Sequence, residues 1–589
     1  MYIRELKLWN FRKYGKSEFD LSIPHLSITF SKGLNVLIGE NDSGKTAIID
    51  AIKMVLKTHA YEWIKIEDTD FFVGAEKLRI ELIFAEIKPE EAKNFIEWLG
   101  WESVDDLNVP ILRLIYQVEK KGRRILPTDV QAGMDEMGFP LNAEAKEYLK
   151  TTYLKALRDA DTELVAKKNS RLSQIFQGHD LFKETDEAKH EFTGWFKELN
   201  GKIKEWFQST DVQESGKNNK AQIKDIIDDF LKEFIDGEVS SVLEATDPEI
   251  KAILEKLSLT IEGATNLGLG TLNRLYMATE LLHLKKEWDG LKLCLIEELE
   301  AHLHPQAQMK IVEVLRKETE VQFILTTHSP NLASKVPIEN LIICNKEGVF
   351  PLAKGKTKLA DKNYNYLKRF LDVTKSNLFF ARGVIIVEGW AEEILIPALA
   401  QKLGYDLTKH EVSIVNVGST AYLHFAKIFL RSEGSLMKTP ISILTDLDVR
   451  PGKDGSFDDD EQKNKEVRIK AGLGDLSNTN LKLHIAKEWT LEWCLYKSNI
   501  LSELFRQSVS NVHSKTKSFK KDGGVWDGNF ESALISKLTK DKSSLDKVAV
   551  ANELAELIAN NIIDFTINDP YLNYLIDAIK HTCRIADDN

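Results

Sequence analysis

The residues with the clearest chemical meaning form an eight-residue run near the N-terminus, Gly39-Glu40-Asn41-Asp42-Ser43-Gly44-Lys45-Thr46. The run matches the phosphate-binding loop pattern, and it follows an apolar, strand-like segment and precedes a helical one. Its glycines let backbone amide hydrogens surround phosphate oxygens, while lysine reaches the terminal phosphates and threonine can ligate Mg²⁺. The residues expected to contact a nucleotide are Gly39, Asn41, Gly44, Lys45 and Thr46.

A pair of carboxylates, Glu297 and Glu298, directly follows the apolar run 291–296. Phosphoryl transfer needs a metal clamp and a positioned water, so one carboxylate can hold Mg²⁺ while the next polarises the attacking water. The alternative is a solvated acidic strand end. The phosphate-binding loop earlier in the chain favours the catalytic interpretation.

A second acidic group occurs in the C-terminal half. Glu388 ends an apolar run and Glu392 follows four residues later, so a helix turn can bring both toward one point. Asp446 and Asp448 lie on one side of an extended chain by its two-residue period. Such a cluster repels itself unless it surrounds hard cations that take oxygen ligands. The alternative is that each acid caps the next helix.

The elements around these residues are short apolar runs separated by helical patterns, which is typical of α/β domains with mainly parallel sheets. The opening segment predicts a strand, loop, helix and strand, and a second alternation begins near Ser376. Strands are expected within 34–38, 78–87, 291–298, 321–329 and 339–344, and then within 381–389, 411–419, 440–448 and 481–486.

The range from 143 to about 234 differs, because it carries long, charge-laced helical patterns with almost no strand signal. We interpret it as a helical insertion that serves in dimerisation or as a lever. The expected domains are residues 1–142 and 241–375 for the two lobes of the first α/β domain, 143–240 for the insertion, and 376–589 for the second α/β domain with a helical C-terminal part.

Composition limits the function classes. A chain of 589 residues with 43% hydrophobic and 29% charged residues can form more than one core. A net charge of -12 excludes a uniformly basic protein that coats nucleic acid, so any DNA contact must be local. The four separated cysteines favour a reducing compartment without structural zinc, and no run is apolar and long enough for a bilayer. We therefore expect a cytoplasmic protein.

Two motifs resemble one branch of ATPases. The run from Ile296 to Pro305, with Thr327-His328-Ser329-Pro330 after the next strand, looks like the ABC-type branch that includes recombination and chromosome-maintenance ATPases. The resemblance implies ATP as cofactor, Glu297 as the Mg²⁺ carboxylate, Glu298 as the catalytic carboxylate, Glu300 in the loop between subunits, His328 as the γ-phosphate switch, and Arg12 near the nucleotide.

The run Leu267 to Asn273 resembles a degenerate signature motif, which in this branch completes the nucleotide site of the partner subunit. The resemblance therefore implies a homodimer or a higher even-numbered oligomer. One departure is that no glutamine occurs between Ala51 and Tyr116, where the branch has a coupling glutamine. Asp70 is a candidate substitute.

The acidic motifs of the second half resemble a Toprim domain, and this order of domains is similar to that of the OLD (overcoming lysogenisation defect) family of ATP-dependent endonucleases. The resemblance implies DNA cleavage with two divalent ions, Mg²⁺ or Mn²⁺, and a role in phage defence, with a possible partner subunit or RNA-DNA element. It implies metal ligands at Glu388, Glu392, Asp446, Asp448 and Glu492, and a lysine near the scissile phosphate at Lys547, with Lys540 and Lys542 as alternatives.

Two other functions stay open. A DNA-repair or chromosome-type ATPase could retain the Toprim carboxylates without cleaving DNA. A primase or topoisomerase could use a Toprim domain, although no accompanying zinc module or tyrosine-bearing domain is recognisable. Nicking of plasmid DNA separates the first alternative from an endonuclease, and RNA synthesis or relaxation without nicks would favour the second.

Overall fold

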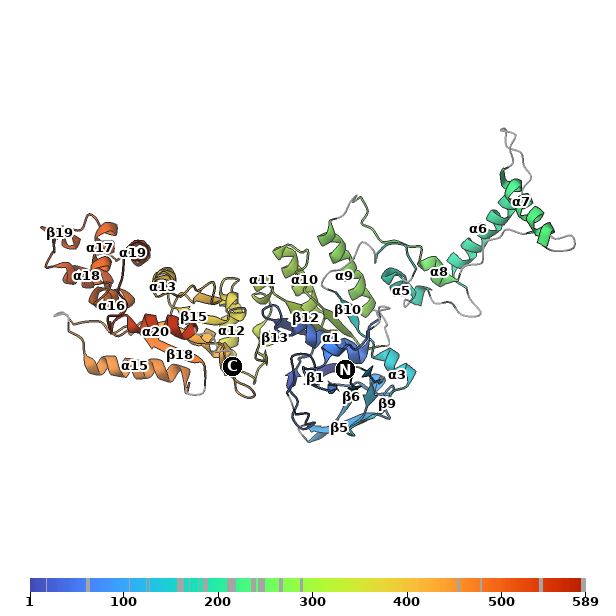
Figure 1. Ribbon diagram of the computed structural model, residues 1–589, viewed down its shortest axis with the longest axis horizontal. Helices are drawn as coiled ribbons and strands as arrows, with labels where there is room; N and C mark the ends of the chain where they lie inside the picture. Colours follow the sequence, from blue (N-terminus) through green and yellow to red (C-terminus); the bar gives the residue numbers. More distant parts are fainter. Residues whose placement is uncertain are drawn as a thin grey trace.

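The computed structural model of the chain describes all residues except 17, 60–63, 105, 123, 127, 156–163, 169, 178–179, 183, 185–188, 209–218, 235–239, 242–248, 264–267, 286–289, 453–455, 477–478, 540–543 and 584–589. The molecule is elongated, with the N-terminal α/β domain in the middle, the C-terminal domain at one end and helices α6 and α7 projecting at the other (Figure 1). No helix in the described ranges is both long and apolar enough to cross a membrane.

The N-terminal domain contains an antiparallel sheet of eight strands. Its main path runs in the order β2-β1-β4-β6-β8-β9, and β5 and β7 both pair with β6. The strands are β1 (Tyr2–Trp9), β2 (Leu26–Thr29), β4 (Lys77–Ala85), β5 (Leu99–Val104), β6 (Leu107–Lys121), β7 (Arg124–Ile125), β8 (Gln131–Ala132) and β9 (Phe139–Pro140).

A second sheet carries the phosphate-binding loop. Its order is β10-β11-β12-β3-β13-β14, and all neighbouring pairs are parallel except β13 with β14. The strands are β3 (Leu34–Ile38), β10 (Thr152–Leu154), β11 (Leu293–Ile296), β12 (Gln322–Thr327), β13 (Leu341–Cys344) and β14 (Val349–Pro351). The strands expected in this region are therefore confirmed, and β3 lies between β12 and β13.

Helix α1 (Lys45–Leu56) packs between the two sheets. Strand β3 alternates by its two-residue period: Leu37 faces the core that contains α1, whereas Val36 and Ile38 face the core on the other side, which α9 (Leu269–Lys285) and α10 (Pro305–Lys317) cover. Burial on both faces explains why β3 is apolar except at Asn35, whose buried amide hydrogen-bonds to Ser31.

Two expectations need correction. The opening segment has the expected order of strand, loop, helix and strand in β3, the phosphate-binding loop, α1 and β4, but its two strands belong to different sheets, β4 to the antiparallel one and β3 to the other. The range 143–240 is also not wholly helical, since β10 within it pairs with β11 after the short helix α3 (Ala143–Tyr148). Beyond β10 the described elements are helices: α5 (Arg171–Gln177), η2 (Asp180–Phe182), α6 (Glu191–Gln208) and α7 (Asn219–Phe234).

The C-terminal domain is built on a parallel sheet of four strands in the order β16-β15-β17-β18. The strands β15 (Gly383–Val387), β16 (Val412–Asn416), β17 (Ile441–Thr445) and β18 (Leu481–Ile485) confirm all four expected runs. The helices around it include α13 (Trp390–Lys402), α15 (Asp459–Leu473), α16 (Leu491–Lys497), α17 (Ser502–Val512), α18 (Phe530–Leu538), α19 (Lys547–Asn560) and α20 (Asn573–Thr582).

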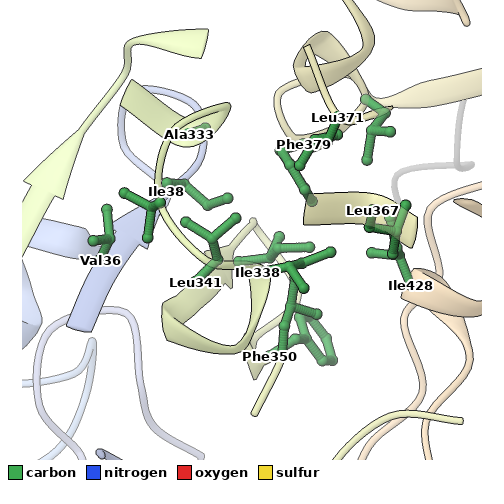
Figure 2. Close-up of a cluster of buried hydrophobic side chains, with 14 of the residues drawn as sticks. Val36, Ile38, Ala333, Ile338, Leu341, Phe350, Leu367, Leu371, Phe379 and Ile428 are labelled. Atoms are coloured by element: carbon green, nitrogen blue, oxygen red, sulfur yellow. The ribbon is translucent and has the colours of Figure 1, made fainter. Parts of the chain in front are cut away.

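One hydrophobic core continues from the N-terminal domain into the C-terminal domain. Figure 2 shows it passing from Val36 and Ile38 of β3, through Ile338 and Leu341, to Leu367 of α12 (Asp361–Phe370) and Ile428. The turn η4 (Lys375–Phe379) contains the expected domain boundary, and it contributes Leu378 and Phe379 to the same core. The two domains are therefore packed against each other rather than joined by a free linker.

Candidate active sites

The phosphate-binding loop connects the end of β3 to the first turn of α1. Gly39 and Gly44 have φ values of 146° and 97°, which L side chains rarely adopt. A Cβ at Gly39 would lie 1.9 Å from the carbonyl oxygen of Cys344, and one at Gly44 would lie 2.2 Å from the hydroxyl oxygen of Tyr14. Both glycines are thus required for the loop to curl against its neighbours.

Lys45 is held inside the curl of the loop. Its Nζ donates to the carbonyl oxygens of Gly39 at 2.9 Å and Glu40 at 2.5 Å, and to Ser43 Oγ at 3.1 Å. Burial lowers the pKa of Lys45 to about 8, and the nearby acids oppose that shift only in part. Because a phosphate would favour the charged ammonium, the side chain is prepared to bind an anion.

The two carboxylates that follow β11 face the same cavity as the loop. Glu297 is buried and accepts a hydrogen bond from the Tyr153 hydroxyl at 2.7 Å, and burial raises its pKa. Glu298 adopts a φ of 43°, and its backbone N–H donates to Thr326 Oγ1 at 3.0 Å. The cavity, of about 380 Å³, is lined by Arg12, Lys13, Asn41, Asp42, Ser43, Gly44, Lys45, Thr46, Ala47, Glu297, Glu298, Thr326 and His328.

His328, directly after β12, links the loop to the segment after β11. Its backbone N–H donates to Glu300 Oε1 at 2.5 Å, and its Nδ1 lies 3.0 Å from the Gly39 carbonyl oxygen and 3.4 Å from Lys45 Nζ. Burial and the charge of Lys45 lower its pKa. A neutral imidazole at this position can donate a hydrogen bond to an oxygen of a terminal phosphate.

Arg12 reaches the cavity from the antiparallel sheet. Its guanidinium contacts Asp50 Oδ2 at 2.8 Å and Asp70 Oδ1 at 3.0 Å. Asp70, suggested as a replacement for the coupling glutamine, is buried and does not line the cavity. Its observed contact is with Arg12, so it orients the arginine.

The signature-like run lies elsewhere. Leu267 falls outside the described residues. Gly268 directly precedes α9, whose first turn contains Gly270, where a Cβ would lie 2.6 Å from the carbonyl oxygen of His302. Gly268, Gly270 and Thr271 line a separate cavity of about 390 Å³. The run therefore does not contribute to the phosphate-binding cavity of its own chain.

The acids of the C-terminal domain gather at the carboxyl edge of its sheet. Strands β15 and β17 are parallel neighbours, so Glu388 and Asp446, which follow them, leave the sheet side by side. Glu392 lies in the first turn of α13 and Glu492 in the first turn of α16. Lys547 begins α19, and its Nζ lies 2.8 Å from Glu492 Oε2.

Hydrogen bonds fix the orientation of these acids. Glu388 Oε1 accepts a hydrogen bond from the Thr445 hydroxyl, and Asp446 Oδ1 accepts one from the backbone N–H of Leu491 at 2.8 Å. Asp448 has a φ of 56°, and its backbone N–H donates to the carbonyl oxygen of Trp489 at 2.8 Å. The loops after β17 and β18 are thereby tied together.

The acidic edge is short of positive charge. Burial raises the pKa of Glu392 to about 7 and that of Asp446 well above its ordinary value, and Glu492 adds to both shifts. Burial and the charge of Asp448 raise the pKa of Glu388. Among the described residues, no three His, Cys, Asp or Glu side chains already enclose an ion-sized position. A buried set of carboxylate oxygens nevertheless has the donor chemistry that Mg²⁺ or Mn²⁺ requires.

Three further residues at the two sites were not predicted from the sequence. The hydroxyl of Thr445 donates a hydrogen bond to Glu388, and that of Tyr153 donates one to Glu297. Of these two residues, only Thr445 has a signal in the sequence, because it directly precedes Asp446. The Tyr574 hydroxyl of α20 is buried without a hydrogen-bond partner in the described structure, and the charges of Asp446, Glu392 and Glu492 act on it. Lys540 and Lys542, the alternatives to Lys547, lie outside the described residues.

The two sites define the class of protein: a phosphate-binding-loop ATPase domain joined to a Toprim domain. Residues 1–225 and 142–333 match the family described as AAA ATPase domain, and residues 379–448 match the TOPRIM domain described as overcoming lysogenization defect protein-like. The chain belongs to the AAA ATPase domain family and carries the Toprim domain of the OLD proteins, as the sequence motifs predicted.

Relatives match this chain at low identity. The chain is 21% identical over 559 residues to "Endonuclease GajA" of Bacillus cereus (strain HuB5-5), covering 79% of this chain and 78% of the relative. It is 20% identical over 451 residues to "Retron Vc95 probable ATPase" of Vibrio cholerae serotype O1 biovar El Tor, covering 65% and 81%. A solved C-terminal region of the Xanthomonas campestris pv. campestris OLD protein aligns with 35% of this chain and 94% of that structure, at 20% identity and a TM-score of 0.24.

Proposed function

We propose that the chain is an ATP-binding, divalent-metal-dependent DNA endonuclease in which the Toprim domain cleaves and the ATPase domain regulates. The observation that carries the proposal is the group of buried carboxylates at the edge of β15 and β17, with Lys547 beside them. The raised pKa values of Glu392 and Asp446 support it, because added positive charge would stabilise these carboxylates in their ionised form.

In the proposed reaction, two Mg²⁺ or Mn²⁺ ions would be held by Glu388, Glu392, Asp446, Asp448 and Glu492. The ions would supply Lewis-acid activation of water and charge neutralisation at the scissile phosphate. Thr445 and the Leu491 backbone keep Glu388 and Asp446 oriented. The ammonium of Lys547, at the start of α19, contributes charge next to Glu492 and would face a DNA phosphate brought to this edge.

At the other site, Lys45 and the loop amides bind the phosphates of ATP, Thr46 and Glu297 hold its Mg²⁺, and Glu298 positions the attacking water. The proposed contact of His328 with the γ-phosphate is supported by its Nδ1, which lies 3.0 Å from the Gly39 carbonyl oxygen and 3.4 Å from Lys45 Nζ. Because the signature-like run lies in a separate cavity, we propose that a second copy of the chain supplies it, in a homodimer or a higher even-numbered oligomer.

The names of two relatives bear on the biological role. One relative is named as an endonuclease and another as a probable retron ATPase. We propose that this chain acts in the cytoplasm as an effector of antiviral defence against phage, with a possible partner subunit or RNA-DNA element.

The test is cleavage of supercoiled and linear DNA by the purified full chain with Mg²⁺ or Mn²⁺, with and without ATP. Glu388→Gln and Asp446→Asn should each lower cleavage about a thousandfold, because metal-ion catalysis supplies several kcal/mol. Glu466→Gln, an exposed acid of α15 paired with Lys470, is the matched control and should cleave like wild type.

The competing function is a DNA-repair or chromosome-type ATPase whose Toprim domain is structural. It would be favoured if the wild type hydrolyses ATP and yet leaves DNA intact with both metals, with and without ATP. The raised pKa values at the acidic edge speak against it, because a purely structural cluster gains nothing from crowding carboxylates.

A further inference from the structure

The phosphate-binding loop contacts the Toprim domain through an ion pair. Glu40, the second residue of the loop, places Oε2 3.4 Å from Arg382 Nε, which also lies 2.7 Å from Glu411 Oε2. The backbone N–H of Arg382 donates to the carbonyl oxygen of Glu411 at 2.9 Å. Arg382 is therefore held at the start of β15 while its side chain reaches the loop.

A second contact passes through the turn between β13 and β14. Glu347 Oε2 accepts a hydrogen bond from the backbone N–H of Lys438 at 3.1 Å, in the segment that enters β17. The same turn touches the loop side, since Lys13 Nζ donates to the carbonyl oxygens of Asn345 at 2.9 Å and of Ser43. The turn is thus hydrogen-bonded to Lys13, which also contacts the phosphate-binding loop, and to the segment that enters β17 of the Toprim domain.

These contacts reach the two strands that carry the acids. Arg382 immediately precedes the five-residue strand β15, whose other end leads to Glu388. The segment of Lys438 leads into the five-residue strand β17, whose other end leads to Asp446. The loop therefore contacts the amino end of β15 directly and that of β17 through the β13–β14 turn, and the acids lie at the carboxyl ends of both strands.

The packing between the sites is continuous, because β3, η4, β15 and β17 contribute to one hydrophobic core. Figure 2 shows the part of this core that contains Val36 and Ile38 of β3 and Phe379 of η4. A packed interior transmits a displacement instead of absorbing it. A cavity of about 430 Å³, lined by Glu40, Glu347, Arg382 and Lys438 among others, adjoins both contacts. The ion pair consequently has space to rearrange when the loop closes on a phosphate.

We propose that Arg382, with Glu347 as its companion, transmits the nucleotide state of the phosphate-binding loop to β15 and β17 and so sets the spacing of Glu388 and Asp446. The inference rests on the proposed nuclease function for its activity readout. Arg382 touches neither set of reacting groups, so it is a positioning residue. Its loss should remove the response to ATP while leaving both chemistries in place.

The experiment measures DNA cleavage by the full chain with and without ATP for wild type, Arg382→Ala and Arg382→Ala with Glu347→Ala. We expect ATP to change wild-type cleavage about tenfold and to change that of Arg382→Ala less than about twofold, as for the loss of an allosteric coupling. Metal-dependent cleavage without nucleotide and ATP hydrolysis should both stay near wild-type rates. Lys409→Ala, which removes another cation from the same cavity, is the control and should respond like wild type.

A full ATP response in the double variant, or a wild type that cleaves without any ATP response, overturns the proposal. Hydrogen exchange separates its failure from that of the nuclease function, because it needs no DNA. In a Glu298→Gln background that retains ATP, nucleotide should alter exchange in peptides covering 383–388 and 441–446, and Arg382→Ala should abolish the change. If nucleotide leaves hydrogen exchange unchanged in the Glu298→Gln protein that retains Arg382, the proposed coupling is overturned, even if DNA is never cut.

Discussion

The two candidate sites have opposite charge. At the phosphate-binding loop, the cation Lys45 is buried among carbonyl oxygens, and burial lowers its pKa to about 8. At the Toprim edge, carboxylates are buried beside the cation Lys547, and burial raises the pKa of Glu392 to about 7. Each site disfavours its own charge until a ligand of the opposite charge binds, an anionic phosphate at one and divalent cations at the other.

The sites also differ in completeness. The acids of the Toprim edge come together from β15, α13, β17 and α16 within one chain. The ATPase cavity lacks the signature-like run of its own chain, which lines a different cavity. We therefore expect ATP hydrolysis to require association of two copies of the chain, whereas a single chain should contain every acid of the nuclease centre.

Removing the cation of the ATPase site should have the largest effect. Lys45→Ala should lower ATP hydrolysis about a thousandfold, because catalysis of phosphoryl transfer is almost entirely positioning and charge stabilisation. Cleavage with metal alone should persist. Phosphate release from ATP is the measurement, with the exposed Lys32→Ala as control. ATP hydrolysis that survives Lys45→Ala would place the nucleotide elsewhere.

Removing the cation of the Toprim site should have a smaller effect, because metal ions also neutralise the acids. Lys547→Met should lower DNA cleavage about a hundredfold, as for the loss of one charge that stabilises a transition state. Without metal its thermal midpoint should also fall, since buried Glu492 loses its ion-pair partner, and Mg²⁺ should recover part of that loss.

The exposed Lys463→Met is the control for this variant. Thermal unfolding with EDTA and with Mg²⁺ measures the stability, and plasmid cleavage measures the rate. Cleavage at the wild-type rate by Lys547→Met would assign the lysine role to Lys540 or Lys542 instead.

The smallest effect concerns pH. Burial raises the pKa of Glu392 from 4.5 to about 7, so its contribution to stability is fully present below about 4.5 and is lost as pH rises through about 7. In EDTA, the thermal midpoint of wild type should fall over this range relative to that of Glu392→Gln. Affinity for Mn²⁺ should rise with pH up to about 7, about tenfold per unit for one displaced proton. Parallel pH profiles of the two proteins would show that Glu392 titrates normally.

Much of each site could be predicted from local sequence. The loop from Gly39 to Thr46 is contiguous, and the acids Glu388 and Asp446 each end an apolar run, so their positions follow from the way parallel strands deliver their carboxyl ends to one edge. The division of the first domain into two sheets could not be predicted, because the residue pattern of β1 and β3 marks each as a strand but does not say with which strands it pairs.

The choice among lysines shows the same limit. The sequence favours Lys547, which stands ahead of an apolar helical run, but does not exclude Lys540 or Lys542. The packing of α19 against α13 and α17 brings Lys547 to Glu492. The roles of Tyr153 and Tyr574 could not be anticipated either, since each is far along the chain from the acids it approaches.

The order of residues along the chain therefore determines which chemical groups each strand end presents, because the strand period and the strand-to-helix connection are local properties. The tertiary structure decides which of those ends meet. It brings Glu297 and Lys45 to one cavity, joins Glu40 to Arg382 and leaves the described part of the signature-like run in a separate cavity, since these relations depend on sheet order and on the packing of one continuous core. Long-range packing is a property of the whole fold, and no window of sequence contains it.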